Sequence, residues 1–103
     1  MSATDLYLDL LKKSLTDTLR AEEPDADDAN AGAYVVDFVR HYIRGDAVTM
    51  LPMARLDNLQ HCVTQVIADG VPGDLIETGV WRGGASIFMR GVLAALGDET
   101  RTV

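Results

Sequence analysis

Residues 73–86 read Gly73-Asp74-Leu75-Ile76-Glu77-Thr78-Gly79-Val80-Trp81-Arg82-Gly83-Gly84-Ala85-Ser86. The pattern predicts a short strand over residues 74–78, apolar in its middle as a buried parallel strand is. A glycine-rich turn and a helix over residues 85–96 are expected to follow, with Gly97 ending the helix. In open α/β sheets, ligands bind where the carboxyl end of a strand meets the start of the next helix. The stretch therefore predicts a ligand site at the turn.

Helices are expected before this strand. Residues 2–19 form an amphipathic pattern, and Ser2 with Asp5 has the form of a capping box. The first stripe consists of Leu8, Leu11, Leu15 and Leu19, broadened by Leu10. An acidic linker over 21–32 precedes a second helix over 33–44. A third helix over 53–69 has a core stripe of Leu56, Leu59, Val63, Val66 and Ile67, and Gly70 is expected at its end.

The order of these elements predicts an α/β fold. Residues 1–47 are expected to form a helical cap or lid region with the acidic linker, and residues 48–103 the start of a Rossmann-like domain. Thr102 and Val103 begin a second strand, so we interpret the chain as the front part of such a domain. One strand and the start of another make no stable sheet. We therefore expect the isolated chain to be aggregation-prone or partly molten.

Composition excludes several kinds of partner. The formal net charge of −7 opposes binding to nucleic acid and to anionic lipid. No apolar run approaches the roughly 20 residues that span a bilayer, and the N-terminus lacks a secretion signal, so a cytoplasmic protein is expected. The single cysteine, Cys62, cannot form an internal disulfide. We expect it to be a small buried or half-buried residue.

The turn contains the residue types that a polar ligand needs. Gly79, Gly83 and Gly84 lack the Cβ atoms that would keep a ligand away from the backbone. The start of the next helix presents N–H groups and a positive dipole end. Glu77 could accept hydrogen bonds from an ammonium or hydroxyl group, and Ser86 could add a hydroxyl.

The spacing of the glycines narrows the class of ligand. The dinucleotide fingerprint is not matched. A P-loop is a nearer match, but Ala85 occupies the position of its lysine, so ATP or GTP hydrolysis is not expected. An acid followed closely by Gly79 resembles the first motif of S-adenosylmethionine-dependent methyltransferases.

Longer motifs carry a more specific resemblance. Residues 58–62, 69–74 and above all 77–84, Glu-Thr-Gly-Val-Trp-Arg-Gly-Gly, resemble the macrocin and mycinamicin sugar O-methyltransferases of macrolide antibiotic biosynthesis. Residues 7–12 are similar as well, and the likeness covers roughly the whole chain. It implies transfer of a methyl group from S-adenosylmethionine to a sugar hydroxyl of a macrolide, a glycosylated small-molecule substrate, assisted by magnesium.

The resemblance also implies a set of cofactor-binding residues. They are Thr49, Met50, Glu77, Thr78, Gly79, Val80, Trp81, Arg82, Gly83 and Gly84. Ser86 joins them because of its position in the first turn of the predicted helix. The family's ribose-binding acid, magnesium ligands and general base are expected past Val103. No catalytic or metal-binding residue is therefore assigned, and the isolated chain is expected to be inactive. The first helices resemble the family's lid and oligomer-forming region, which implies a homo-oligomer of the full-length enzyme.

Some alternatives stay open at this point. Trp81 lines the pocket or packs under the loop. Arg82 binds the cofactor carboxylate or pairs with Glu77 or Asp57. His61 is expected to be structural, because no carboxylate cluster accompanies it. A competing function is a non-catalytic helical fragment that mediates assembly.

Overall fold

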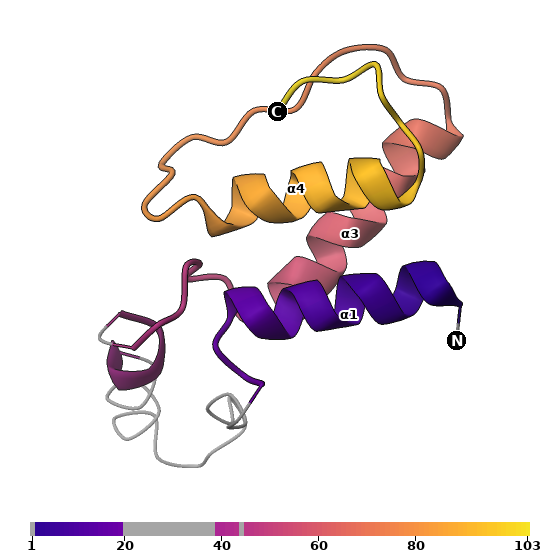
Figure 1. The fold of residues 1–103 in the computed structure, drawn as a ribbon. Coiled ribbons are helices and arrows are strands. Elements are labelled where there is room, and N and C mark those ends of the chain that lie inside the picture. The colour runs from indigo at the N-terminus through magenta and orange to yellow at the C-terminus, as the bar shows by residue number, and fades with distance from the viewer. Residues whose placement is uncertain (1, 20–38, 44) are drawn as a thin grey trace.

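The computed structural model describes residues 2–19, 39–43 and 45–103 (Figure 1). Its elements are α1 (Ala3–Leu15), the short π-helix η1 (Val39–Ile43), α3 (Met53–Ala68) and α4 (Gly84–Ala95). The helices predicted over 53–69 and 85–96 are thus confirmed to within a residue at each end. The acidic linker and most of the helix predicted over 33–44 lie outside the described residues.

Helix α1 begins where the sequence predicts and ends earlier. The Asp5 amide donates to Ser2 Oγ at 3.1 Å and the Ser2 amide donates to Asp5 Oδ2 at 3.1 Å, which confirms the capping box. The helix ends at Leu15 rather than Leu19, because Asp17 adopts a left-handed backbone with φ of 57°. The Thr18 amide then donates back to the Lys13 carbonyl at 2.9 Å, which closes the last turn.

The buried face of α1 is narrower than predicted. Leu10 and Leu19 are 55% and 57% exposed, so neither belongs to the core stripe. Lys12 is buried on the face of α1 that packs against the other helices. Its Nζ lies 2.7 Å from Asp57 Oδ1 of α3 and 5.9 Å from the centre of the Phe88 ring of α4. The long alkyl stem of lysine can cover apolar surface while its ammonium reaches a carboxylate.

One hydrophobic core joins the three long helices, each of which contacts the other two (Figure 1). Gly91 brings α4 close to α1, because a Cβ there would collide with the end of the Leu11 side chain. Burying each large apolar side chain is worth about 1.5–3 kcal/mol. The core residues are Leu8, Leu15, Leu56, Val63, Phe88, Met89, Val92 and Leu93. Both predicted domains contribute to this core, and their division near residue 47 stays a prediction.

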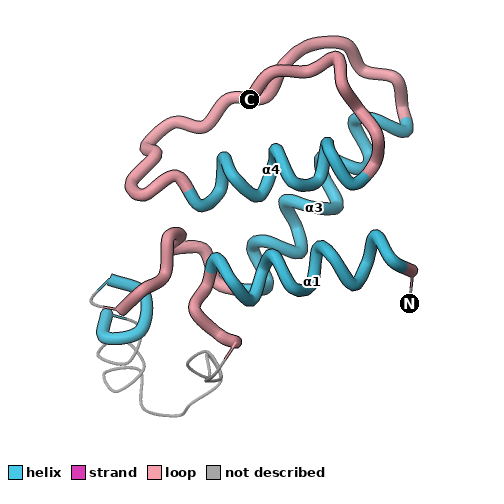
Figure 2. The backbone as a smooth tube through the Cα atoms, viewed as in Figure 1, coloured by secondary structure: helices cyan, strands magenta, loops and turns pink. Residues whose placement is uncertain are grey.

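The predicted strands are not formed within the described residues. Segments 71–83 and 96–103 are drawn as loops that pass over α4 on the side away from α1 (Figure 2). A single backbone bond joins them, from the Leu75 amide to the Thr102 carbonyl at 2.9 Å. The neighbouring bond of a parallel ladder, from the Thr102 amide to the Gly73 carbonyl, is not formed, because the Thr102 amide donates to Asp74 Oδ1 and the Arg101 guanidinium donates to the Gly73 carbonyl.

The burial predicted for the first strand is also wrong in part. Leu75 is half-buried against the core, but Ile76 is 85% exposed. Successive side chains of an extended segment point to opposite sides. Among the described residues, helices cover only the Leu75 side. Because none of these residues forms a strand, the Rossmann-like sheet is not confirmed in this chain.

Candidate functional site

Left-handed backbone shapes the glycine turn. Gly79 and Gly83 have φ of 84° and 85°, and Gly83 is the N-cap of α4. A Cβ added to Gly79 would meet nothing within 4 Å, and one added to Gly83 would meet only a Val80 methyl group at 4.0 Å. These two glycines therefore leave open space beside the backbone, as the approach of a ligand requires.

Gly84 serves a different purpose. Its amide donates to the Val48 carbonyl at 2.9 Å. A Cβ on Gly84 would lie 2.5 Å from Cβ of Thr49 and 2.7 Å from the carbonyl carbon of Val48. The space that this glycine leaves is filled by the chain itself, so the reason expected for it, access for a ligand, does not apply at this position.

The acid after the predicted strand is held by the helix that follows. Ser86, in the first turn of α4, donates its hydroxyl to Glu77 Oε1 at 3.1 Å. Both residues are partly buried, whereas Thr78 and Val80 are exposed. The bond fixes one oxygen of the Glu77 carboxylate at the edge of the open turn, and the second oxygen can accept further hydrogen bonds.

Trp81 and Arg82 form a stacked pair at the tip of the turn. The guanidinium carbon of Arg82 lies 4.3 Å from the centre of the Trp81 ring. Trp81 has a left-handed backbone, with φ of 49°, and is 40% exposed, so its ring is not packed away under the loop. Arg82 Nη1 donates to the Gly45 carbonyl at 3.2 Å and to the Ala47 carbonyl at 2.8 Å.

Of the two predicted site residues from the cap side, Thr49 reaches the start of α4. Thr49 is buried next to Gly84, and its hydroxyl accepts the Leu51 amide at 3.0 Å. Met50 is exposed. Residues that lie more than thirty positions apart in the sequence thus meet at the start of α4.

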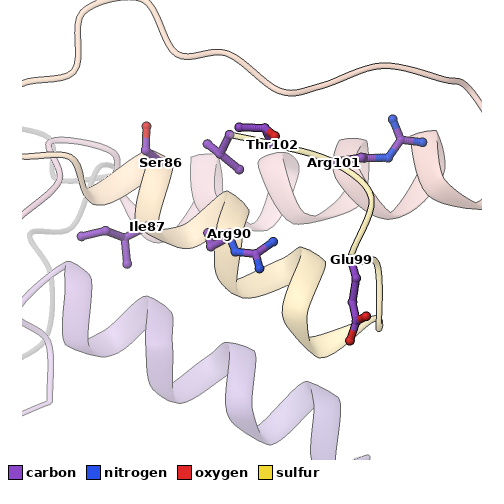
Figure 3. A pocket seen from close by; sticks show the side chains of 7 residues that line it. Ser86, Ile87, Arg90, Glu99, Arg101 and Thr102 are labelled. Carbon is purple, nitrogen blue, oxygen red and sulfur yellow. The ribbon is translucent and has the colours of Figure 1, made fainter.

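A cavity of about 580 Å³ lies between α4 and the last residues of the chain (Figure 3). Ser86 connects this cavity to Glu77. Its lining is Ser86, Ile87, Arg90, Glu99, Arg101, Thr102 and Val103. Sequence reasoning named only Ser86 among these for the site, because no local pattern indicates that the segment after α4 folds back along it.

A smaller hollow of about 340 Å³ lies between α1 and α3, lined by Lys12, Asp57, Gln60, His61 and Thr64. His61 is exposed there. Cys62 is exposed as well, contrary to expectation, because it lies on the outer side of α3. Across the part of the chain that the structure describes, no three His, Cys, Asp or Glu side chains gather as a metal ion requires, and no helix has the length and apolarity to cross a membrane.

The sequence profile described as Macrocin-O-methyltransferase (TylF) matches residues 43–103, more than half of the chain. The chain belongs to the macrocin O-methyltransferase family. It is 52% identical to the 8-demethyl-8-(2,3-dimethoxy-alpha-L-rhamnosyl)-tetracenomycin-C 4'-O-methyltransferase of Streptomyces olivaceus, a match that covers 98% of this chain and 40% of that protein. This likeness confirms the resemblance seen in the motifs.

Two further comparisons place this macrocin-type chain among its relatives. It is 44% identical to the mycinamicin III 3''-O-methyltransferase of Micromonospora griseorubida over 99% of this chain and 41% of that one. The solved structure of the O-methyltransferase NovP superposes with a TM-score of 0.72 at 45% identity, covering 97% of this chain and 40% of NovP. The chain thus spans about 40% of the length of the relatives it matches.

Proposed function

We propose that this chain supplies the S-adenosylmethionine-binding turn of an O-methyltransferase, one that methylates a sugar hydroxyl of a macrolide-type natural product. The names of the relatives support this proposal, since the tetracenomycin enzyme is by name the 4'-O-methyltransferase of a rhamnosyl compound and the mycinamicin enzyme is by name a 3''-O-methyltransferase. Because the chain spans about 40% of those proteins, the activity is proposed for the enzyme of their full length.

The observation that carries the proposal is the open space at Gly79 and Gly83 beside the oriented Glu77 carboxylate. The methionine end of S-adenosylmethionine carries an ammonium and a carboxylate. The free oxygen of Glu77 is suited to the ammonium, and the N-terminal end of α4 favours negative charge. When bound, the cofactor supplies an electrophilic methyl group.

The residues of this chain then act by binding and orienting. Ser86 keeps Glu77 in place, and the exposed Thr78, Val80 and Met50 would border the cofactor. A sugar hydroxyl is a weak nucleophile near neutral pH and needs a base or a metal ion. No described residue suits either task, so magnesium and the base are proposed to be held by the remainder of the full-length enzyme, and the isolated chain to be inactive.

A chimera tests the proposal. Residues 1–103 replace the corresponding first 40% of the Streptomyces olivaceus enzyme, and S-adenosylmethionine binding is measured by calorimetry. Gly79→Ala and Gly97→Ala form a matched pair, because both glycines have φ near 80° and open space around the missing Cβ. We expect Gly79→Ala to abolish binding and Gly97→Ala to keep it. A folded chimera that binds no cofactor, or equal effects of the two substitutions, would refute the proposed site.

The proposal also covers the oligomeric state and the cellular location of the full-length enzyme. Leu6, Tyr7 and Leu10 are exposed on α1, an apolar surface that suits contact with a second subunit, so a homo-oligomer is proposed for the full-length enzyme. A cytoplasmic location and the absence of nucleic-acid partners are proposed from the acidic sequence. Light scattering of the chimera measures its oligomeric state.

A further inference from the structure

Val48 connects the end of one helix to the start of another. Its amide donates to the Leu15 carbonyl at the C-terminal end of α1, at 3.0 Å. Its carbonyl accepts the amide of Gly84 at the N-terminal end of α4, at 2.9 Å. One peptide segment therefore satisfies an unpaired carbonyl of α1 and an unpaired amide of α4 at the same time.

Arg82 ties the glycine turn to that same segment. Its Nη1 atom reaches the carbonyls of Gly45 and Ala47, on the N-terminal side of Val48, while the Gly84 amide reaches Val48 itself. The two attachments lie on either side of Gly83, so residues 45–48 hold both the tip and the end of the turn. The Trp81 ring stacks on the same guanidinium.

We propose that Arg82 is a positioning residue for the cofactor turn, which it holds against residues 45–48, and that it is not a ligand of the cofactor carboxylate. This inference rests on the proposed function. Its physical basis is the backbone of the turn, since Trp81 and two glycines adopt left-handed conformations that surrounding contacts must maintain. A guanidinium with several donors can hold two carbonyls and an aromatic face together.

The cofactor-free chain provides the first test. Trp81 is the only tryptophan, so all tryptophan fluorescence arises from the turn. Arg82→Ala should lower the fluorescence anisotropy of Trp81 and speed amide exchange at Val48 and Gly84 by at least about tenfold, because the charged hydrogen bonds to the Gly45 and Ala47 carbonyls are lost. Arg82→Lys should give smaller changes, because an ammonium can still reach a carbonyl. Arg55→Ala is the control, since Arg55 is an exposed arginine on α3.

The chimera described above provides the second test. S-Adenosylmethionine and its decarboxylated analogue are each titrated into the chimera with Arg82 and with Arg82→Ala. If Arg82 positions the turn, Arg82→Ala should weaken the binding of both compounds by a similar factor, about tenfold. If Arg82 is instead a ligand of the carboxylate, the substitution should weaken only the binding of S-adenosylmethionine. The Arg82→Lys variant should recover part of the affinity for both.

The outcomes separate the two proposals. Unchanged exchange at Val48 and Gly84 in Arg82→Ala, or a loss of affinity confined to the compound with a carboxylate, overturns the positioning role and leaves the proposed function intact. A folded chimera with Arg82 that binds neither compound overturns the proposed function. In that case the exchange rates still decide whether Arg82 holds the turn.

Discussion

Gly84→Ala should loosen the join between residues 45–49 and α4. The added Cβ would lie 2.5 Å from Cβ of Thr49 and 2.7 Å from the carbonyl carbon of Val48, and backbone atoms cannot move aside as a flexible side chain can. Overpacking of this kind costs about 1–3 kcal/mol. Loss of the bond from Gly84 to Val48 costs about 1 kcal/mol more. The lower entropy of unfolded alanine offsets about 0.4–1 kcal/mol, which leaves a net loss of about 2 kcal/mol.

Urea denaturation and amide exchange measure this effect. The free energy of unfolding should fall by about 2 kcal/mol, and the Val48 amide should exchange faster because the bond to Leu15 is strained together with the contact to Gly84. Gly97→Ala is the control, since a Cβ there meets nothing and only backbone strain of about 1–2 kcal/mol is added. If Gly84→Ala leaves the exchange of Val48 unchanged, residues 45–49 do not pack on the turn as described.

Three other predictions concern charge and exposure. Hydrogen bonds from the Thr100 amide and hydroxyl, and then from Arg101, hold the pKa of Asp98 below its ordinary value of 3.8. The stabilising contribution of the Asp98 carboxylate is therefore complete above pH 3.8 and is lost as the pH falls through the lowered pKa. Asp98→Asn should therefore destabilise the chain at neutral pH, and its difference from the parent chain in urea denaturation should shrink in acid; a constant difference would contradict the assignment. Asp57→Ala should lower the free energy of unfolding by about 1 kcal/mol, because it leaves the buried Lys12 without its carboxylate partner. Lys12→Met should leave the free energy of unfolding nearly unchanged, and equal losses of stability in thermal unfolding would argue against this. Ile76→Thr should reduce dye binding by exposed apolar surface and slow aggregation with little change in stability, because Ile76 is 85% exposed; unaltered aggregation would show that another surface is responsible.

Local signals predicted a large part of the fold. Ser2 and Asp5 indicated where α1 begins, the apolar stripe of α3 and the position of Gly70 indicated that helix and its end, and the run of glycines indicated the turn before α4. Each of these signals acts within one or two helical turns of the chain. The family motif over 77–84 belongs with them, since the sequence alone indicated the family that the comparisons then showed.

The partners of the site residues depended on the tertiary structure. The sequence predicted that Arg82 binds the cofactor or pairs with a carboxylate of the chain. In the folded chain, Arg82 donates hydrogen bonds to the carbonyls of Gly45 and Ala47. The sequence also predicted that Gly84 leaves space for a ligand, but Val48 and Thr49 occupy that space. Every residue has the same backbone carbonyl and amide, so no side-chain pattern marks which of them will accept a bond from a distant residue. The start of α1, the end of α3, the turn and the family were therefore encoded locally. The end of α1 and the contacts that hold the turn were decided only when α1, α4 and the segment between them packed on one core.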